Sequence, residues 1–406
     1  MKRALVFFMA IGMVFVFCTP APAQEKSLEE RVKALEETFG TWSFYGSARF
    51  LTFYQKSDNN AFTDSDKISN LTGPDQKTTQ WALANNSRLG ATVNKGDLGG
   101  RVELGLQDSS SVSLRLMYGT YTYNGVTFLF GQDYTPLGDY GNYCSQVFAG
   151  DLTLKGWGLI DENTTRTPQV KIRWKGLQVA LVQSNGTNPK TSANTVTFAN
   201  AYKDPVTGVV TNPRTENLMP HLEARYTLKM DQFFGDVFGG VNTFKIKDKT
   251  AKYSYDIDKT VNAYAFGLGG GLTLNPIYAN AMAWMGRNCK QLGLHQADSA
   301  GAQYDVTTDK LTNDKDFGWM AVVGAKIETI NFETGYGFVS SELDKSGSIK
   351  DKAQSYYLNA SIPVAKTKLA KFTVVPEIGV FDYMKDAKGA DQGKVTYAGA
   401  KWQVDF

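Results

Sequence analysis

Apolar and polar residues alternate along this chain in many runs of up to about ten residues. Clear examples are 88–93, 101–107, 170–175 and 221–228. Successive side chains of a β-strand point to opposite faces, so each run is typical of a strand with one apolar and one polar or small face. Such strands fit a soluble sandwich, whose apolar faces are buried, or a membrane barrel, whose apolar faces meet lipid.

The lengths of the connections distinguish these two folds. Short connections, such as 124–125 and 175–176, alternate with long ones, such as 133–167 and 185–218, and only 108–111 departs from this order. An up-and-down barrel that crosses a membrane has tight turns at one rim and long loops at the other. The sixteen predicted strands are 43–55, 82–94, 99–107, 112–123, 126–132, 168–175, 177–184, 219–229, 233–246, 260–274, 276–288, 317–328, 330–341, 354–365, 371–383 and 394–406.

We therefore predict an all-β fold, a transmembrane antiparallel up-and-down β-barrel of about sixteen strands over residues 41–406. Fourteen or eighteen strands would also fit the pattern. Aromatic residues near strand ends, among them Trp174, Phe233 and Trp402, fit the interfacial girdles of such barrels. The mean hydropathy of −0.30 agrees with a water-filled barrel, because half of each strand and all of the loops face water.

Residues 1–23 have the layout of a cleaved secretory signal peptide. Lys2 and Arg3 precede an apolar stretch at 4–17, and Ala21 and Ala23 supply the small residues that a signal peptidase needs. The apolar stretch is too short to span a membrane as a helix. The segment predicts export from the cytoplasm.

Residues 24–40 form the only convincing helix, with Ser27 and Glu30 in the positions of a capping box. One apolar stripe runs along this helix and consists of Leu28, Val32, Leu35 and Phe39. A helix of about fifteen residues is marginal by itself, so the stripe needs a partner. A short coiled coil between subunits would supply one, and a flexible periplasmic spacer is the alternative.

The chain resembles the trimeric 16-stranded porins of the Gram-negative outer membrane. The resemblance covers nearly everything after Gly40: the number of strands, the order of the loops, and the final Phe406, which is similar to the signal read by barrel-assembly machinery. The segments 44–49 (FYGSAR) and 131–133 (GQD) are also similar. The resemblance implies a homotrimer in outer-membrane lipid and a third loop, here 133–167, that folds into the pore and narrows it. The short connection 108–111 departs from general porins, in which the second loop contacts a neighbouring subunit.

If the apolar faces look to lipid, a series of basic residues lines the lumen, because a charge facing lipid at mid-depth would cost about 2–4 kcal/mol. This basic wall consists of Arg49, Arg88, Arg101, Arg115, Lys171 and Arg173. Opposite it we expect the constriction-loop acids Asp133, Asp139, Asp151, Asp161 and Glu162. Together they would set up a transverse field. Alternatively, the basic residues are solvated without effect on permeation, or pair locally with Glu103.

The function predicted from these features is a water-filled channel for passive diffusion of small hydrophilic solutes and ions. The alternative is a substrate-specific anion channel for phosphate, carboxylates or similar solutes. We expect no enzyme, metal or cofactor, because the only histidines, His221 and His295, have no recognisable catalytic partner. A net charge of +3 gives no reason to expect nucleic acid as a partner.

Two cysteines follow the signal segment, Cys144 and Cys289. Exported proteins meet oxidising conditions, and both residues fall in connections at the same predicted rim. The sequence therefore allows a disulfide between them, although two thiols without a role would fit equally well.

Overall fold

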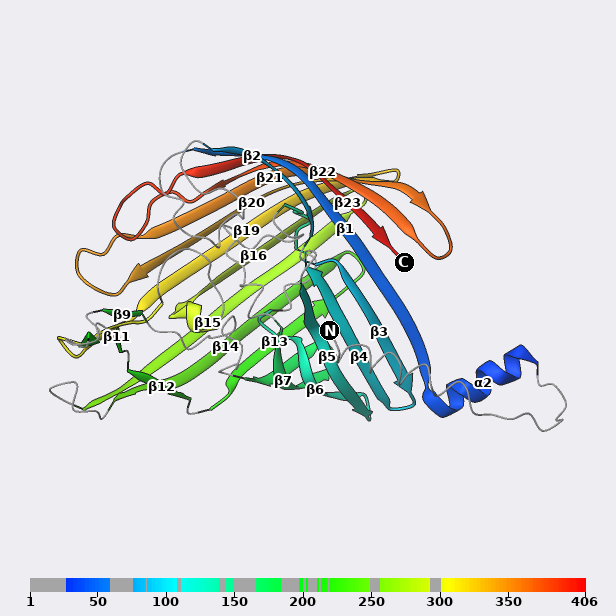
Figure 1. Ribbon diagram of the computed structural model, residues 1–406, viewed down its shortest axis with the longest axis horizontal. Coiled ribbons are helices and arrows are strands. Elements are labelled where there is room, and N and C mark those ends of the chain that lie inside the picture. The colour runs from blue at the N-terminus through cyan, green and yellow to red at the C-terminus, as the bar shows by residue number, and fades with distance from the viewer. Residues whose placement is uncertain are drawn as a thin grey trace.

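The computed structural model describes residues 27–58, 76–84, 86–107, 111–138, 143–148, 166–183, 197–199, 202–203, 210–211, 213–217, 219–248, 256–292 and 301–406. These residues form a closed antiparallel β-barrel of 16 strands with one short helix outside it (Figure 1). The predicted fold class and strand number are confirmed. The predicted signal peptide at 1–23 lies outside the described residues.

The sheet contains eighteen strand elements that make sixteen barrel strands, because β2 and β3 follow one another along β1, and β12 and β13 follow one another along β14. The barrel closes between β23 and β1, where Ala48 lies opposite Val404. The barrel strands are β1 (Thr41–Asp58), β2 (Lys77–Leu83), β3 (Arg88–Lys95), β4 (Leu98–Gln107), β5 (Ser111–Tyr123), β6 (Val126–Tyr134), β7 (Arg166–Trp174), β8 (Leu177–Val182), β12 (Arg214–Asn217), β13 (His221–Lys229), β14 (Phe233–Asp248), β15 (Ile257–Leu274), β16 (Ile277–Arg287), β19 (Asp314–Ile327), β20 (Ile330–Leu343), β21 (Asp351–Lys366), β22 (Lys371–Asp382) and β23 (Lys394–Asp405).

The predicted second strand, 82–94, is wrong as a continuous element. The structure divides it into β2 and β3, which pair end to end with β1. The ladder between β3 and β4 stops at the pair Arg88 and Gly105. The Ser87 hydroxyl occupies the break, where it accepts from the Arg49 N–H and donates to the Arg49 carbonyl oxygen.

Several short connections of the barrel are tight turns that need positive backbone φ angles. Asn124 and Gly125 have φ of 48° and 77°, and Lys175 and Gly176 have φ of 44° and 85°. These angles are those of two-residue turns whose twist matches that of the flanking strands. The hairpins predicted at 124–125 and 175–176 are therefore confirmed.

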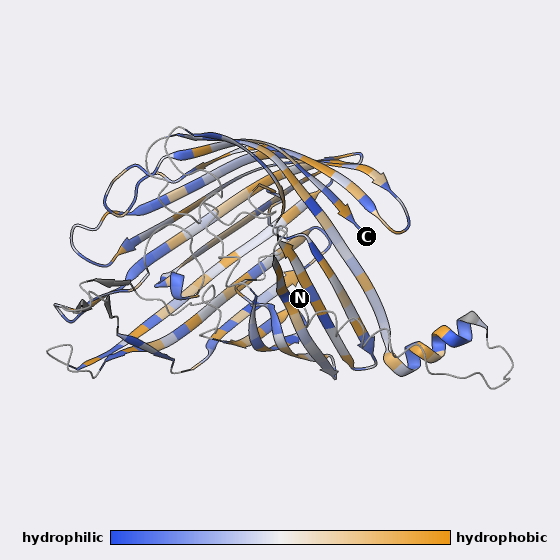
Figure 2. Ribbon diagram, viewed as in Figure 1, coloured by the Kyte–Doolittle hydropathy of each residue, from blue (hydrophilic) through white to orange (hydrophobic). Residues whose placement is uncertain are grey.

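The two faces of the barrel strands differ in polarity. Along β15 the residues alternate between buried and exposed, and the exposed series includes Tyr264, Phe266 and Leu268. Large exposed apolar side chains occur on strands all around the barrel, so its outer surface is apolar. Figure 2 shows the alternation of apolar and polar residues along the strands.

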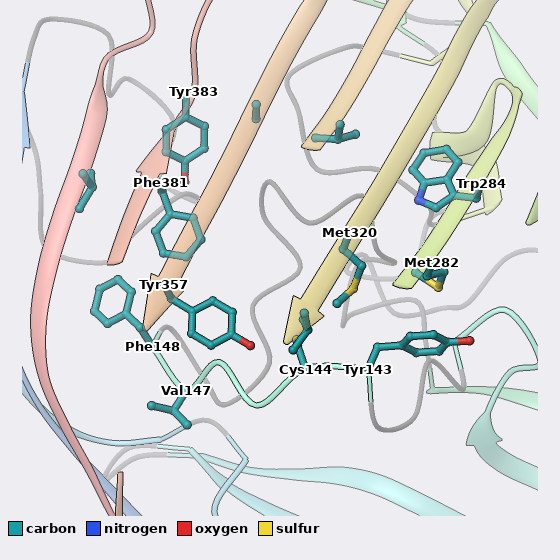
Figure 3. Packing of buried hydrophobic residues seen from close by; sticks show 14 of the residues in the cluster. Tyr143, Cys144, Val147, Phe148, Met282, Trp284, Met320, Tyr357, Phe381 and Tyr383 are labelled. Atoms are coloured by element: carbon teal, nitrogen blue, oxygen red, sulfur yellow. The ribbon is translucent and has the colours of Figure 1, made fainter. Parts of the chain in front are cut away.

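The inner face is not uniformly polar, although the alternation alone predicts a polar one. Buried apolar residues from β1 and from β14 to β23 form a cluster with segment 143–148 (Figure 3). Trp284, Met320 and Phe381 belong to it. Here a connection packs against the wall, so wall positions that would otherwise meet water carry apolar side chains.

A second apolar cluster lies near the rim with the long connections. Phe244, Ile246 and Val261 of β14 and β15 pack with Tyr304 and Val306. Tyr304 belongs to a small sheet formed by β9 (Thr197–Ala199), β17 (Gln303–Asp305) and β18 (Lys310–Thr312). The remaining short elements are β10 (Tyr202–Lys203), β11 (Val210–Thr211) and the 3-10 helix η2 (Cys289–Leu292).

The helix α2 (Leu28–Phe39) precedes β1 and projects away from the barrel (Figure 1). Ser27 and Glu30 form both hydrogen bonds of the capping box, so this predicted helix and its cap are confirmed. Val32, Leu35 and Phe39 of the apolar stripe are exposed. Of the helices in the described ranges, none is both long and apolar enough to cross a membrane.

Candidate functional site

A cluster of three arginines around one carboxylate lies on the inner face of β3, β4 and β5. Glu103 is fully buried and lies 2.7 Å from Arg115, 2.8 Å from Arg101 and 3.6 Å from Arg88. The Tyr45 hydroxyl donates to the same carboxylate. Three predicted members of the basic wall therefore contact one carboxylate. Local pairing with Glu103 was one of the alternatives that the sequence left open.

A β-bulge brings Arg115 into this cluster. The register between β4 and β5 shifts after Glu103, which lies opposite Leu116, while Leu104 lies opposite Leu114. Arg115 is thus the extra residue of the bulge, and both it and Leu116 are buried. A bulge re-aims a side chain in this way because it interrupts the strict alternation of faces.

A second ion-pair group lies on β6 and β7. The Lys171 ammonium and the Arg173 guanidinium each lie 2.6 Å from the same oxygen of Asp133. Asp133 belongs to β6 and lies opposite Thr167 of β7. Its expected place in the constriction loop is therefore wrong, because β6 continues to Tyr134 and pairs there with β7.

Of the remaining residues predicted to line the pore, one lies in the barrel wall and the others lie outside the described residues. Arg49 is buried on β1, and its Nε donates to the Ser47 hydroxyl at 2.9 Å. The other constriction-loop acids lie outside the described residues: Asp139, Asp151, Asp161 and Glu162.

The described parts of the third long connection, 135–138 and 143–148, are here called the inserted segment; they pack against the inner face of the barrel, and carboxylates of the wall hold them there. The Leu137 N–H donates to Glu223 of β13 at 3.0 Å. The Tyr143 hydroxyl donates to Asp236 of β14 at 2.7 Å. Burial and this neighbouring carboxylate raise the pKa of the Tyr143 phenol, which therefore stays protonated as the donor.

Further along, backbone groups of the same connection bind two more buried acids. The Ser145 N–H donates to Glu333 of β20 at 2.5 Å. The backbone N–H groups of Val147 and Phe148 donate to the two carboxylate oxygens of Glu377 of β22, at 2.8 and 3.0 Å. Sequence reasoning placed the acids on the loop and missed these wall carboxylates, although the position of Glu223 in the polar face of its strand was a visible signal.

Aromatic packing adds to these hydrogen bonds. Phe148 is fully buried and stacks on Tyr397 of β23 with ring centroids 4.0 Å apart. It also contacts Phe53 of β1 at 4.9 Å and Phe381 of β22 at 5.9 Å. Phe148 and Phe381 lie close together in Figure 3.

The basic residues and the inserted segment occupy different arcs of the barrel. The basic wall lies on β1, β3, β4, β5 and β7, which belong to one stretch of the closed sheet. Hydrogen bonds of residues 137–138 and 143–148 fall on strands from β13 round to β23. The lumen thus has a basic arc on one side and an inserted segment on the other.

The possible disulfide between Cys144 and Cys289 is not formed. Both thiols are buried but not joined. Cys144 lies in the inserted segment, whereas Cys289 begins η2, where its Sγ contacts the Tyr264 carbonyl oxygen at 3.6 Å. Burial raises the pKa of the Cys289 thiol well above its usual range.

Of the two histidines, His221 is buried on β13 and His295 lies outside the described residues. No three histidine, cysteine or acidic residues come close enough to hold a metal ion in the part of the chain that the structure describes.

Solved structures of outer-membrane proteins share this fold. The outer-membrane channel DcaP of Acinetobacter baumannii is 18% identical, with a TM-score of 0.62 over 90% of this chain and 97% of that one. An anion-selective porin of Comamonas acidovorans is 10% identical, with a TM-score of 0.56 over 90% and 99%. The trimer form of OmpT, an outer-membrane protein of Vibrio cholerae, is 16% identical, with a TM-score of 0.53 over 89% and 99%.

No protein-family model and no curated protein sequence matches the chain. The resemblance predicted from the sequence is confirmed at the level of fold: the chain is a closed 16-stranded barrel of the porin type.

Proposed function

We propose that this protein is an outer-membrane porin, a water-filled channel for passive diffusion of small hydrophilic solutes and ions. The observation that carries the proposal is the distribution of side chains over a closed barrel. Apolar residues cover the outside, where they fit lipid, and ionised groups line the inside, where they fit water. Diffusion through such a channel needs no coupled source of energy.

The charges of the described wall support an anion preference for this channel, which is the first requirement of the alternative, a substrate-specific anion channel. On the basic arc, Arg88, Arg101 and Arg115 share Glu103, so the cations outnumber the acid. On the opposite arc, wall carboxylates such as Glu377 are buried beneath the inserted segment and accept its N–H groups. The surplus of positive charge on the basic arc therefore attracts anions to this side of the lumen and repels cations from it.

Ion flux through single channels tests this proposal. In a planar bilayer with a salt gradient, we expect a reversal potential whose sign shows that anions pass more readily than cations. Arg88→Gln with Arg101→Gln should reduce it, while Lys350→Gln, an exposed outer position, should not. A protein that gives no conductance would refute the channel, and equal cation and anion flux would refute the anion preference alone.

We also propose a homotrimer, exported by a cleaved signal peptide at 1–23 and assembled in the outer membrane. In this organisation 24–40 is the amphipathic helix and 41–406 the barrel. The exposed stripe of Val32, Leu35 and Phe39 supports a coiled coil between three copies of α2.

The oligomer can be tested on gels. Without boiling, the protein should migrate at about three times the monomer mass. Leu35→Asp should weaken the trimer, whereas Glu37→Gln, an exposed position on the face of the same helix opposite the stripe, should leave it unchanged. Migration of the unboiled wild type as a monomer would contradict the trimer, and an unaffected Leu35→Asp trimer would contradict the coiled coil.

A further inference from the structure

A cavity of about 900 Å³ opens near the rim that carries the short turns. Its lining includes residues of the turns at 175–176 and 230–232. Its basic lining residues are Arg173 of β7, Lys175 of the following turn, and Arg225 and Lys229 of β13, and Tyr143 of the inserted segment also lines it. The cavity is therefore separate from the arginine cluster around Glu103.

Arg225 is the unusual member of this lining. Its side chain faces the lumen and is only 4% exposed. Its Nε and Nη2 atoms are buried and have no hydrogen-bond partner among the described residues. Two buried guanidinium nitrogens without hydrogen-bond acceptors are costly, so such a group is a candidate for binding an anion.

The neighbouring acids do not supply the missing bonds. The two oxygens of Asp236 accept from the hydroxyls of Tyr143 and Thr227. Glu223, two residues before Arg225 on the same face, accepts from the Leu137 N–H. Both carboxylates thus hold the inserted segment or the wall, although their charges lower the electrostatic cost of Arg225.

Strand register places a second guanidinium near Arg225. Gln178 of β8 lies opposite Arg225 on one side and opposite Arg173 on the other. Because adjacent strands are about 4.8 Å apart, the backbones of the two arginines are about 10 Å apart. Arg173 binds Asp133 through Nη2 and has one unpaired buried nitrogen, Nε, whereas Arg225 has two, Nε and Nη2, and so retains the larger unused donor capacity.

One wall of the cavity is aromatic. Phe234 and Tyr143 both line it, and their rings pack edge to face with centroids 5.5 Å apart. Arg225 itself lies over the ring of Phe238 at 4.9 Å. The cavity therefore combines a cation with a planar apolar surface.

We propose that this cavity is a binding site for a small aromatic monocarboxylate. Nε and Nη2 form one edge of the guanidinium, which matches the two oxygens of a carboxylate. The apolar body of the anion packs against Phe234 and Tyr143. The inference rests on the proposed channel only for the route by which the anion arrives.

Benzoate is a suitable probe, and its binding to the purified full-length protein in detergent can be measured by isothermal titration calorimetry at low ionic strength. We expect saturable binding by the wild type. Arg225→Gln should weaken it at least about tenfold, the scale of one charge-assisted hydrogen bond. The affinity of Arg225→Lys for benzoate should lie between those of the wild type and Arg225→Gln, because an ammonium keeps the positive charge but cannot bind a carboxylate with two parallel hydrogen bonds.

Matched controls separate this site from general charge and from folding. Arg287→Gln removes an arginine that lines no part of this cavity and should leave benzoate binding unchanged. Benzyl alcohol, which has the ring without the charge, should not bind, and inorganic phosphate should bind more weakly than benzoate. Each variant should show the same difference in gel mobility between boiled and unboiled samples as the wild type, which would indicate that its barrel is folded.

The proposal is overturned if folded Arg225→Gln binds benzoate as the wild type does. It is equally overturned if benzyl alcohol or phosphate binds as tightly as benzoate. Because the measurement needs no ion flux, a protein that conducts without binding benzoate refutes this site alone. A protein that binds benzoate without conducting refutes the channel alone.

Discussion

Replacing Glu103 by glutamine tests the arginine cluster. The substitution keeps the size of the side chain but removes its charge, and the amide nitrogen becomes a donor that faces the guanidinium donors. Arg115 is affected most, because its side chain is only 7% exposed and its Nε donates to Glu103 at 2.7 Å. Arg88 and Arg101 are more exposed, at 24% and 32%, and keep water as an alternative partner.

The loss of stability follows from the buried pair alone. Removing one partner of a buried ion pair destabilises a protein by about 3–5 kcal/mol. Because the two more exposed arginines are screened by solvent, we count only Arg115 and expect a loss of about 3 kcal/mol in the free energy of unfolding.

The same change should strengthen anion selectivity. One unit of positive charge about 7 Å from an ion in water contributes about 0.6 kcal/mol, or roughly a 2.7-fold change in local concentration. Anions gain and cations lose this factor, so the permeability ratio should shift about sevenfold near 0.01 M salt. Near 1 M salt, where the Debye length is about 3 Å, the shift should almost vanish.

Urea unfolding of the barrel in lipid vesicles measures the first effect, and reversal potentials at the two salt concentrations measure the second. Glu342→Gln is the matched control, because this side chain is 36% exposed and its carboxylate lies 3.7 Å from Lys350. It should change stability by about 0–1 kcal/mol. If Glu103→Gln unfolds like this control and its selectivity is unchanged, the cluster neither stabilises the barrel nor sets the charge of the lumen.

Three further results are expected. Cys144 and Cys289 should resist maleimide in the folded protein and both react in denaturant, and a mobility change on reduction would contradict the two separate thiols. Phe148→Ala should cost about 3–5 kcal/mol of packing and loosen the inserted segment, visible as larger or noisier single-channel currents; an unchanged current would argue against its role in the lumen. The Lys259 ammonium lowers the pKa of Asp309. The stabilisation that this ion pair gives to the folded protein is therefore present above about pH 4 and is lost as the pH falls through the lowered pKa of Asp309. Lys259→Gln should thus speed hydrogen exchange in 301–312 at pH 7 but not at pH 2, and equal acceleration at both would contradict this pair.

The strands and their order were predictable from the sequence because period-two alternation and turn residues are local signals. Asn124 and Gly125 favour a two-residue hairpin turn, because both residues readily adopt the positive φ angles that it needs. The break between β2 and β3 was not predictable, because it depends on where the neighbouring ladder stops, at Arg88 and Gly105. That is a property of the pairing between strands and not of either strand alone.

The site was predictable in part for the same reason. Alternation placed Arg88, Arg101 and Lys171 on the inner face, as the structure has them. It could not show that Arg115 sits in a bulge, because a bulge is a property of the register between two strands. Nor could it show that Glu377 accepts from the inserted segment, because that contact joins residues far apart in the chain.

The hydrogen bonds of the inserted segment also bear on the order of folding. The bond from Leu137 to Glu223 spans 86 residues, and that from Gln146 to Tyr397 spans 251. The inserted segment follows β6 in the chain. The groups that accept hydrogen bonds from Gln146, Val147 and Phe148 nevertheless lie on β22 and β23, the final hairpin of the chain. A chain whose terminal strands have not yet paired has no place for Gln146 and Phe148 to dock. Docking of these two side chains is therefore a late step, and their protection from solvent would report that the barrel has closed.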